Sequence, residues 1–245
     1  MPLLADPELL TLPSLYDNLA LDEAILVEAD ERGLGPLLRL WEQPDYAVVL
    51  GSSRRLLQEV HVERCIADGV AVARRTSGGG TVVIGPGALN ATIVLPMDLS
   101  PELAAVDSAQ IFVLERMARE LRRHAPGVEV RGSGDLTVAG RKFSGSAQRR
   151  LRRRLMVHAT IMYDFTIARV ARYLQAPPRQ PAYREGRAHE EFLMNVPLRR
   201  RIVIESIRAA WPHADLLTAT SDVPRDRLET LRAERFANRS WIERL

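Results

Sequence analysis

A glycine-rich turn between two apolar runs is the feature that most restricts how this chain can fold. Residues 73–82 read Ala-Arg-Arg-Thr-Ser-Gly-Gly-Gly-Thr-Val. Three consecutive glycines let the backbone approach a ligand closely and point amide N–H groups at it. Arg74 and Arg75 place fixed positive charge beside that surface, so the segment predicts a cradle for a carboxylate or a phosphate. A plain glycine turn with two solvated arginines is the alternative, because glycine-rich loops are common.

The cradle does not match the common nucleotide-binding motifs. No Gly-Lys-Ser/Thr follows the glycines, as a Walker loop requires. A dinucleotide fingerprint needs a third spaced glycine and a following helix, whereas this turn leads into Val82-Val83-Ile84, which reads as a strand.

Lys142 is the only lysine among 34 basic side chains. It lies in residues 140–147, Gly-Arg-Lys-Phe-Ser-Gly-Ser-Ala. A bias this strong suggests that arginine serves wherever a generic positive charge is enough. An ammonium is a compact point charge that fits among several acceptor oxygens, whereas a guanidinium is a larger planar fork of donors. The sequence therefore predicts a site that needs an ammonium, with chance survival of one lysine as the alternative.

Composition limits the remaining possibilities. The 245 residues are 46% hydrophobic and 27% charged, which is typical of a globular chain with a full core. No apolar run is long enough to span a membrane, and the first residues lack a secretory signal. The single cysteine, Cys65, fits a reducing compartment and is predicted to pack in the core. We therefore expect a cytoplasmic protein with no membrane partner.

The positive charge is concentrated in two arginine clusters, residues 149–154 and 199–201. Solvated loops are the simplest interpretation, and a basic rim that docks an acidic partner is the alternative. No aromatic residue is interleaved with either cluster, and the net charge is only +3. We therefore expect no nucleic-acid partner.

The order of helical and strand patterns predicts an α/β or α+β domain on a mixed, largely antiparallel sheet flanked by helices. Expected helices are 14–32 with Gly33 as C-cap, 60–68, 107–124, 166–174, 203–211 and 224–237. Expected strands are 37–43 and 46–50, paired through the turn at 44–45, then 69–74, 81–84, 88–95, 128–131, 136–138 and 155–163, and a tight turn at 139–140 leads into residues 141–148. The Pro- and Arg-rich residues 175–190 predict a loop.

Several segments in fixed order resemble the lipoate–protein ligase A family, within the superfamily of biotin and lipoate ligases and octanoyltransferases. They are Asn18–Glu23, Val48–Gly51, Arg74–Gly80, Leu89-Asn90, Gly140–Gln148 and His158–Thr160, so the resemblance covers roughly residues 14–175. It implies a catalytic domain similar to the core of class II aminoacyl-tRNA synthetases. We expect one such domain over 1–245, with a helical segment at about 200–245 and no accessory C-terminal domain.

The resemblance implies an ATP- and Mg²⁺-dependent ligase. Such enzymes convert lipoate to lipoyl-AMP and then acylate the lysine of a lipoyl-domain protein. Lys142 is the implied catalytic residue, because it can bridge the carboxylate and the α-phosphate. The implied site for ATP and lipoyl-AMP comprises Arg74, Arg75, Ser77, Gly78, Gly79, Gly80, Thr81, Val82, Val83, Lys142, Ser144 and Ala147. His158 and Thr160 would line the acyl tunnel, and Asp135 would hold Mg²⁺. The alternative for His158 is a histidine packed in the core, and the alternative for Asp135 is a turn residue before the following strand.

Three departures from the family pattern point to a divergent branch. Gly134 replaces the Asn before Asp135, Ile84-Gly85 replaces a His-Asp, and Ala159 replaces the Gly of His-Gly-Thr. The first departure affects the metal and adenine contacts that the resemblance implies.

The chain also stops about where the catalytic domain of the family ends. Activation of lipoate could therefore need a separate accessory subunit, or the chain could use preformed lipoyl-AMP. The expected acceptors are the E2 subunit of a 2-oxoacid dehydrogenase, the glycine cleavage H protein, or a similar lipoyl-domain protein.

Two other functions remain open from the sequence. An octanoyl transferase would need a thiolate in the active site. Cys65 lies upstream of the cradle on a predicted helix, and residues 127–135 contain no cysteine. A non-catalytic subunit that binds a lipoyl domain is permitted by the departures, but the retained Lys142 argues against it.

Overall fold

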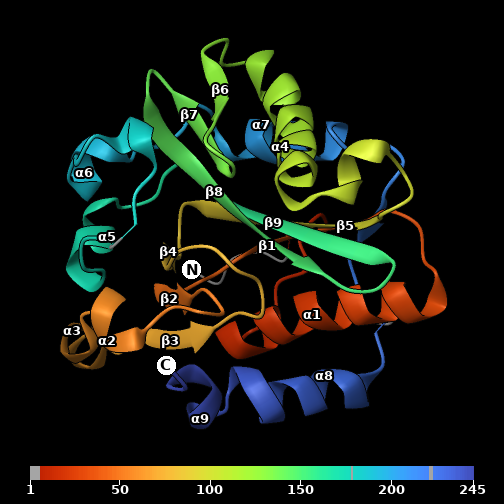
Figure 1. Cartoon of the computed structure of the whole chain (residues 1–245), viewed down its shortest axis with the longest axis horizontal. Helices are drawn as coiled ribbons and strands as arrows, with labels where there is room; N and C mark the ends of the chain where they lie inside the picture. Colours follow the sequence, from red (N-terminus) through yellow and green to blue (C-terminus); the bar gives the residue numbers. More distant parts are fainter. Residues whose placement is uncertain (1–5, 178, 221–222) are drawn as a thin grey trace.

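The computed structural model describes residues 6–177, 179–220 and 223–245. Within them, ten strands form a seven-stranded and a three-stranded sheet, which helices flank (Figure 1). The large sheet has the order β10-β1-β5-β9-β8-β7-β6, and the small sheet has the order β3-β2-β4. Only β1 with β10 and β2 with β3 pair in parallel, so the predicted mixed, largely antiparallel sheet is confirmed.

The element bounds follow the sequence pattern closely. The strands are β1 (Leu37–Glu42), β2 (Ala47–Leu50), β3 (Ala71–Arg74), β4 (Val82–Ile84), β5 (Ala88–Pro96), β6 (Val128–Arg131), β7 (Asp135–Val138), β8 (Arg141–Arg150), β9 (Arg154–Met162) and β10 (Asp215–Leu217). The helices are α1 (Leu15–Arg32), α2 (Leu56–Glu59), α3 (Val62–Ala67), α4 (Val106–Arg122), α5 (Ala168–Tyr173), α6 (His189–Phe192), α7 (Arg200–Ala209), α8 (Arg225–Leu231) and α9 (Arg239–Ile242). Short helical turns are η1 (Pro101–Ala104), η2 (Ala182–Arg184) and η4 (Arg232–Phe236).

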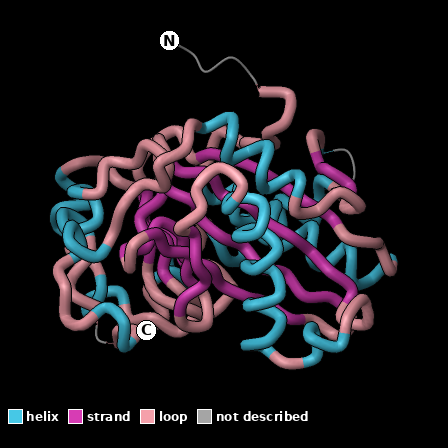
Figure 2. The backbone as a smooth tube through the Cα atoms, turned by 90° about the horizontal axis from the view of Figure 1, so that it is seen from above, coloured by secondary structure: helices cyan, strands magenta, loops and turns pink. Residues whose placement is uncertain are grey.

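The two faces of the large sheet differ because residues alternate along β5. Leu89, Ala91, Ile93 and Leu95 are fully buried on one face, where they join the main core with residues of α4 and α7. Asn90 and Thr92 point to the opposite face, against which α1 packs. Figure 2 shows from above the strands enclosed by helices. One face is therefore apolar and closed, and the other carries polar side chains.

Helix α1 begins and ends as the sequence indicates. The Ser14 side chain accepts a hydrogen bond from the Tyr16 amide, and Gly33 takes the left-handed conformation at the C-cap, with φ of 69°. The predicted C-cap is confirmed. The single cysteine, Cys65, is 1% exposed, as expected, and lies in a second hydrophobic cluster that includes Val60 and Tyr173.

The expected pairing of residues 37–43 with 46–50 is wrong. The turn at residues 44–45 exists, but β1 enters the seven-stranded sheet and β2 the three-stranded one. Strand β2 instead pairs with β3 in parallel and with β4 in an antiparallel manner, so it lies between the two strands that flank the cradle. A local turn signal fixes a change of direction, whereas strand partners are chosen by packing with distant residues.

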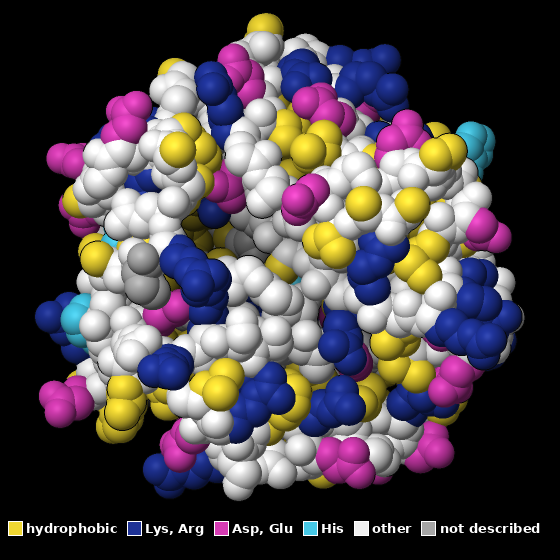
Figure 3. All heavy atoms as spheres, viewed as in Figure 1, with side chains coloured by type: hydrophobic (Ala, Val, Ile, Leu, Met, Phe, Trp, Pro, Cys, Tyr) yellow, Lys and Arg dark blue, Asp and Glu magenta, His cyan; other side chains and the backbone are white. Residues whose placement is uncertain are grey.

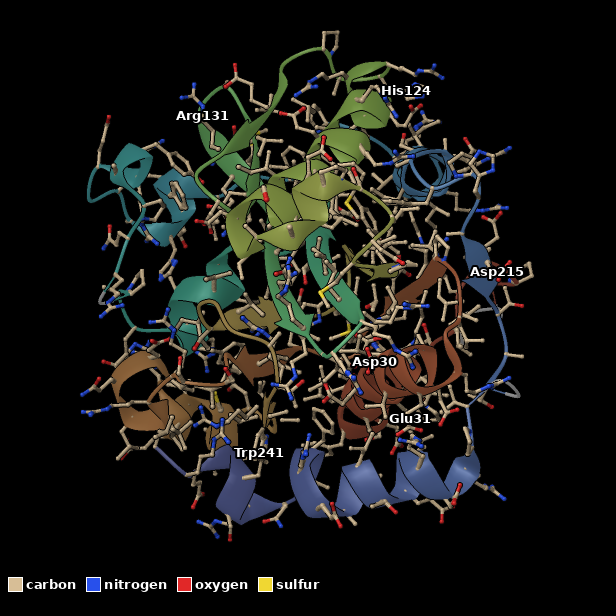
Figure 4. All side chains as sticks on the ribbon, turned by 45° about the vertical axis from the view of Figure 1, so that its right-hand side comes forward. Asp30, Glu31, His124, Arg131, Asp215 and Trp241 are labelled. Carbon is tan, nitrogen blue, oxygen red and sulfur yellow. The ribbon has the colours of Figure 1, made fainter. Side chains whose placement is uncertain are left out.

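The C-terminal segment also departs from expectation, because it is not helical throughout. Residues Asp215–Leu217 form β10, a parallel edge strand beside β1 (Figure 4). After it, α8, η4 and α9 run beneath α1 and β3 (Figure 1). Nε1 of Trp241, labelled in Figure 4, donates to the Arg74 carbonyl at 3.0 Å. None of the helices in the described ranges is both long and apolar enough to cross a membrane.

Candidate functional site

A cleft of about 590 Å³ opens between the polar face of the large sheet, helix α1 and the glycine turn. Its floor follows the strand register. One row, from β1 to β8, is Trp41, Asn90, Thr160 and Gly145, and the next row is Arg39, Thr92, His158 and Ala147. Gly78, Gly79, Gly80, Thr81 and Val82 lie across from this floor. The structure thus brings the cradle, Lys142, Asp135, His158 and Thr160 to one cavity.

Arg75 holds the cradle in shape. Its Nη2 donates to the carbonyls of Gly78 and Gly80 at 2.6 and 2.7 Å, and its Nε donates to Oγ of Ser77 at 3.0 Å. Burial and, to a smaller extent, the nearby Arg54 lower its pKa to about 10, so the side chain stays charged at neutral pH. Most N–H groups of Arg75 therefore donate to the glycine turn itself. The main role of the side chain is to hold the shape of the turn, and few donors are left for a ligand.

The cradle also depends on a close backbone approach. Gly79 has φ of 85°, and a Cβ at Gly51 would lie 2.2 Å from the Gly79 carbonyl oxygen. No side chain fits there, so Gly51 lets the end of β2 pack against the turn. Nε of Arg54, which sequence analysis did not select, donates to the same Gly79 oxygen at 2.8 Å.

Arg74, predicted to bind the ligand, does not lie at the cleft. Its side chain is fully buried behind β3, where it donates to the carbonyls of Ile242, Gly51 and Arg54. The physical reason is strand alternation, which sends the side chains of neighbouring residues to opposite sides. Arg74 therefore joins the C-terminal segment to the loop after β2.

Lys142 lies on β8 and lines the cleft. Its Nζ is 2.6 Å from Oδ1 of Asp135, and its side chain is about a quarter exposed. A Cβ at Gly145 would lie 2.7 Å from Nζ, so only glycine lets the lysine fold back across β8. The predicted catalytic lysine and the predicted metal ligand thus form an ion pair in this structure.

His158 links the floor to the cradle. Its Nε2 lies 2.6 Å from Oγ of Ser77, and its Nδ1 is 4.0 Å from Oδ2 of Asp22. Asp22 is buried and also accepts from Nη1 of Arg39 at 2.6 Å. Burial by itself raises the pKa of Asp22, but the Arg39 charge and the His158 contact outweigh it, so the net shift is downward. Asp22 is thus a buried anion that faces Nδ1 of His158.

The other predicted residues divide between the cleft and the core. Ala147 lines the cleft, and Oγ1 of Thr160 donates to Oδ1 of Asn90 at 2.8 Å. Ser77 and Ser144, both predicted to bind the ligand, are each 1% exposed, and neither lines the cleft. Val83 lines a smaller adjoining cavity of about 250 Å³ rather than the main cleft.

Sequence analysis did not select several residues of the cleft, namely Leu19, Asp22, Trp41, Asn90, Thr92 and Gln110. For Asn90 and Thr92 a signal was present, because polar residues alternate with buried apolar ones along that strand. Nδ2 of Asn90 and Nε1 of Trp41 are buried without a hydrogen-bond partner among the described residues. Their two residues face each other across β1 and β5.

The residues present accommodate Mg²⁺ only with help from a ligand. No group of three or more His, Cys, Asp or Glu in the described part of the chain could hold a metal ion. Both oxygens of Asp135 already accept donors, from Lys142 and from the Tyr183 hydroxyl. Mg²⁺ is often held by one carboxylate together with phosphate oxygens and waters, so Asp135 suits a phosphate-bridging ion and not an all-protein site.

The arginine clusters are mostly engaged in holding the fold, which differs from the expected solvated loops. Arg150 donates to the Leu103 carbonyl, Arg154 to the Leu34 carbonyl, and Arg200 to Glu42. Arg152 is exposed. Figure 3 shows dark blue side chains around the hollowed region of the face seen in Figure 1. The arginines therefore anchor loops as well as making the surface basic.

A thiol is not part of this site. Cys65 does not line the cleft, and burial raises its pKa above the ordinary value. Such a buried thiol is a poor nucleophile.

Comparison with known proteins places these features in context. The family model of the lipoyl protein ligase A/B catalytic domain matches residues 14–196. Over 159 residues the chain is 34% identical to an Aeropyrum pernix protein assigned as a lipoate-protein ligase A, covering 65% of this chain and 58% of that protein. It is 30% identical over 160 residues to the lipoate-protein ligase LplJ of Bacillus subtilis, covering 64% of this chain and 45% of that protein. The chain thus spans about half the length of the curated relatives it matches.

Solved structures show the same fold. A bi-partite lipoate protein ligase from Thermoplasma acidophilum, studied with its E2 lipoyl domain, matches with a TM-score of 0.76 and 21% identity, covering 96% of this chain and 94% of that chain. A T. acidophilum ligase with bound lipoic acid also has a TM-score of 0.76 at 21% identity, covering 97% of each chain. A lipoate-protein ligase A bound with ATP has a TM-score of 0.75 at 21% identity, covering 97% of this chain and 98% of that chain.

Proposed function

The chain belongs to the family of lipoyl protein ligase A/B catalytic domains, and we propose that it activates lipoate with ATP and passes the lipoyl group to a lysine of a lipoyl-domain protein. The observation that carries this proposal is the position of Lys142. The single lysine of the chain lies in the same cleft as the glycine cradle.

In the activation step, the chain supplies binding and charge. The carboxylate of lipoate attacks the α-phosphorus of ATP, and pyrophosphate leaves. Amides of Gly78–Gly80 would face the mixed anhydride, and Lys142 would share its N–H groups between the acyl oxygen and the phosphate. Asp135 is the residue that would hold Mg²⁺, which would supply neutralisation of phosphate charge.

In the transfer step, the acceptor amine attacks the acyl carbon and AMP leaves. Negative charge grows on the carbonyl oxygen, next to which Lys142 would lie. The acyl tail would extend over the row of Gly145, Thr160, Asn90 and Trp41, which leads away from Lys142 across the sheet. No covalent intermediate with the enzyme is needed, which agrees with a cleft that Cys65 does not line.

We further propose that this activation step also needs a separately encoded accessory subunit, whereas transfer from lipoyl-AMP needs this chain alone. The bi-partite ligase of T. acidophilum supports this arrangement, since its fold matches almost the whole chain. The E2 lipoyl domain studied with that ligase supports a lipoyl domain as acceptor.

Mass spectrometry of a purified lipoyl domain tests the function directly. The domain is incubated with this chain, lipoate, ATP and Mg²⁺, and in parallel with synthetic lipoyl-AMP. A gain of one lipoyl group only from lipoyl-AMP is the expected result, and a gain from ATP would show a self-sufficient ligase. No gain in either reaction, with transfer from octanoyl-acyl carrier protein, would replace the ligase with a transferase.

A further inference from the structure

Tyr183 lies outside the residues assigned above, but its hydroxyl contacts the carboxylate that pairs with Lys142. Oη donates to Oδ2 of Asp135 at 2.6 Å, while Nζ of Lys142 lies 2.6 Å from Oδ1. A phenol is protonated at neutral pH, because its ordinary pKa is about 10, so the Tyr183 hydroxyl is a donor to this carboxylate. Each oxygen of Asp135 therefore has its own donor.

The chain holds the Tyr183 ring in a defined place. The ring packs against Phe192, with centroids 5.3 Å apart and planes inclined by 43°. Nη2 of Arg187 donates to the Tyr183 carbonyl at 2.7 Å and to the Gly140 carbonyl at 3.2 Å. Gly140 lies in the turn between β7 and β8, so Arg187 ties the tyrosine to the hairpin that carries Asp135 and Lys142.

A second set of contacts fastens the same segment to β8. The Met194 amide donates to the Lys142 carbonyl at 2.9 Å, and Nη2 of Arg141 donates to the Leu193 carbonyl at 2.5 Å. Residues 183–194 therefore contact the hairpin through backbone and side chains. The Tyr183 hydroxyl therefore contacts Asp135 from a segment that is hydrogen-bonded to β8, the strand that carries Lys142.

We propose that Tyr183 is a positioning residue that acts through Asp135 to present Lys142 to the ligand. The inference rests on the proposed function of the cleft. A carboxylate with one partner can turn both oxygens toward an ammonium. A donor on Oδ2 fixes the plane of the carboxylate and satisfies that oxygen, so Lys142 contacts Oδ1 alone. An ammonium has three N–H groups, and two of them stay available for acyl and phosphate oxygens.

Tyr183→Phe tests this role because it keeps the ring on Phe192 and removes only the hydroxyl. The probe is a non-hydrolysable lipoyl sulfamate ester of adenosine, titrated calorimetrically in metal-free buffer. We expect Y183F to bind it about tenfold more weakly, since Asp135 would hold the ammonium with both oxygens and compete with the ligand. With lipoyl-AMP as substrate, KM should rise more than kcat falls.

Two further variants separate positioning from stability. Tyr163→Phe removes a matched phenol–carboxylate bond, from Tyr163 to Glu42 at 2.8 Å, away from the cleft, and should leave probe affinity unchanged. In an Asp135→Asn background, Y183F should change affinity less than twofold, because the group it acts through is gone. A similar loss in both backgrounds would overturn the proposal.

The result for the unmodified chain distinguishes the two levels of inference. If wild type and Y183F bind the probe equally, Tyr183 does not position Lys142, and the proposed function stands. If wild type does not bind the probe, the proposed function fails and the role of Tyr183 fails with it.

Discussion

Nε2 of His158 lies 2.6 Å from Oγ of Ser77, which joins the floor of the cleft to the glycine cradle. The contact is one link in a chain of polar groups. Arg75 donates to Ser77, the Ser77 hydroxyl is free to donate to His158, and Nδ1 of His158 faces Asp22. A buried cation and a buried anion stand at the two ends. The order of donors and acceptors therefore fixes the rotamer of Ser77 and the shape of the turn.

Replacing His158 should loosen this turn. We expect His158→Ala to weaken binding of the lipoyl sulfamate probe about fivefold, because the Ser77 hydroxyl loses its acceptor and such a bond contributes about 1 kcal/mol. His158→Gln, whose amide oxygen can accept near the position of Nε2, should recover most of the affinity. Calorimetry measures both, and the exposed His213→Ala is the control. Equal affinity in H158A and wild type would exclude a supporting role for the histidine.

Asp22 should make stability depend on pH in the acidic range. Its folded pKa lies below the ordinary value of 3.8, so its contribution is full above that value and is lost as the pH falls through the lower folded pKa. Asp22→Asn leaves Arg39 buried without a counter-charge and should cost about 3–5 kcal/mol at pH 7.

Urea denaturation between pH 7 and pH 3 measures this effect. The difference between wild type and D22N should stay constant down to about pH 4 and then shrink. The exposed Asp98→Asn should match wild type throughout. A difference that grows on acidification would contradict the assigned direction.

Lys142→Arg should keep the fold and abolish acyl-adenylate chemistry. A guanidinium is larger than an ammonium, and Nζ already lies 2.6 Å from Asp135 in the space that Gly145 leaves open. We expect a loss of at least about 100-fold in lipoyl transfer from lipoyl-AMP, with a melting temperature close to wild type. As a control, Arg152→Lys replaces an exposed arginine with lysine and should leave lipoyl transfer and the melting temperature unchanged. Near-normal transfer by K142R would remove the lysine from the mechanism.

The predicted residues that the structure brings to one cleft have sequence signals that are local or compositional. Lys142 stands out because the composition contains only one lysine, and the cradle stands out because three consecutive glycines lie between two predicted strands. Asn90 and Thr92 could have been added, because polar residues inside an otherwise apolar strand mark the face that is not core.

The misplaced features depend on distant partners. Arg74 and Arg75 look alike in the sequence, but strand alternation sends one behind β3, where the carbonyls of Trp241 and Ile242 receive it. Strand β10 has only three residues, too few for a periodic pattern, and exists because β1 offers an open edge. The role of Tyr183 depends on a contact across 48 residues, which no local motif encodes.

Gly145→Ala should separate the position of Lys142 from the stability of the sheet. The new Cβ would lie 2.7 Å from Nζ, which is the movable end of a flexible side chain, so the lysine is displaced and the backbone is not. We expect a melting temperature within about 3 °C of wild type and a loss of roughly tenfold in lipoyl transfer. At Gly127 a Cβ meets Val138 at an ordinary 3.6 Å, so Gly127→Ala is the matched control. Unchanged transfer in G145A would show that the position of Nζ beside Gly145 is not needed for lipoyl transfer.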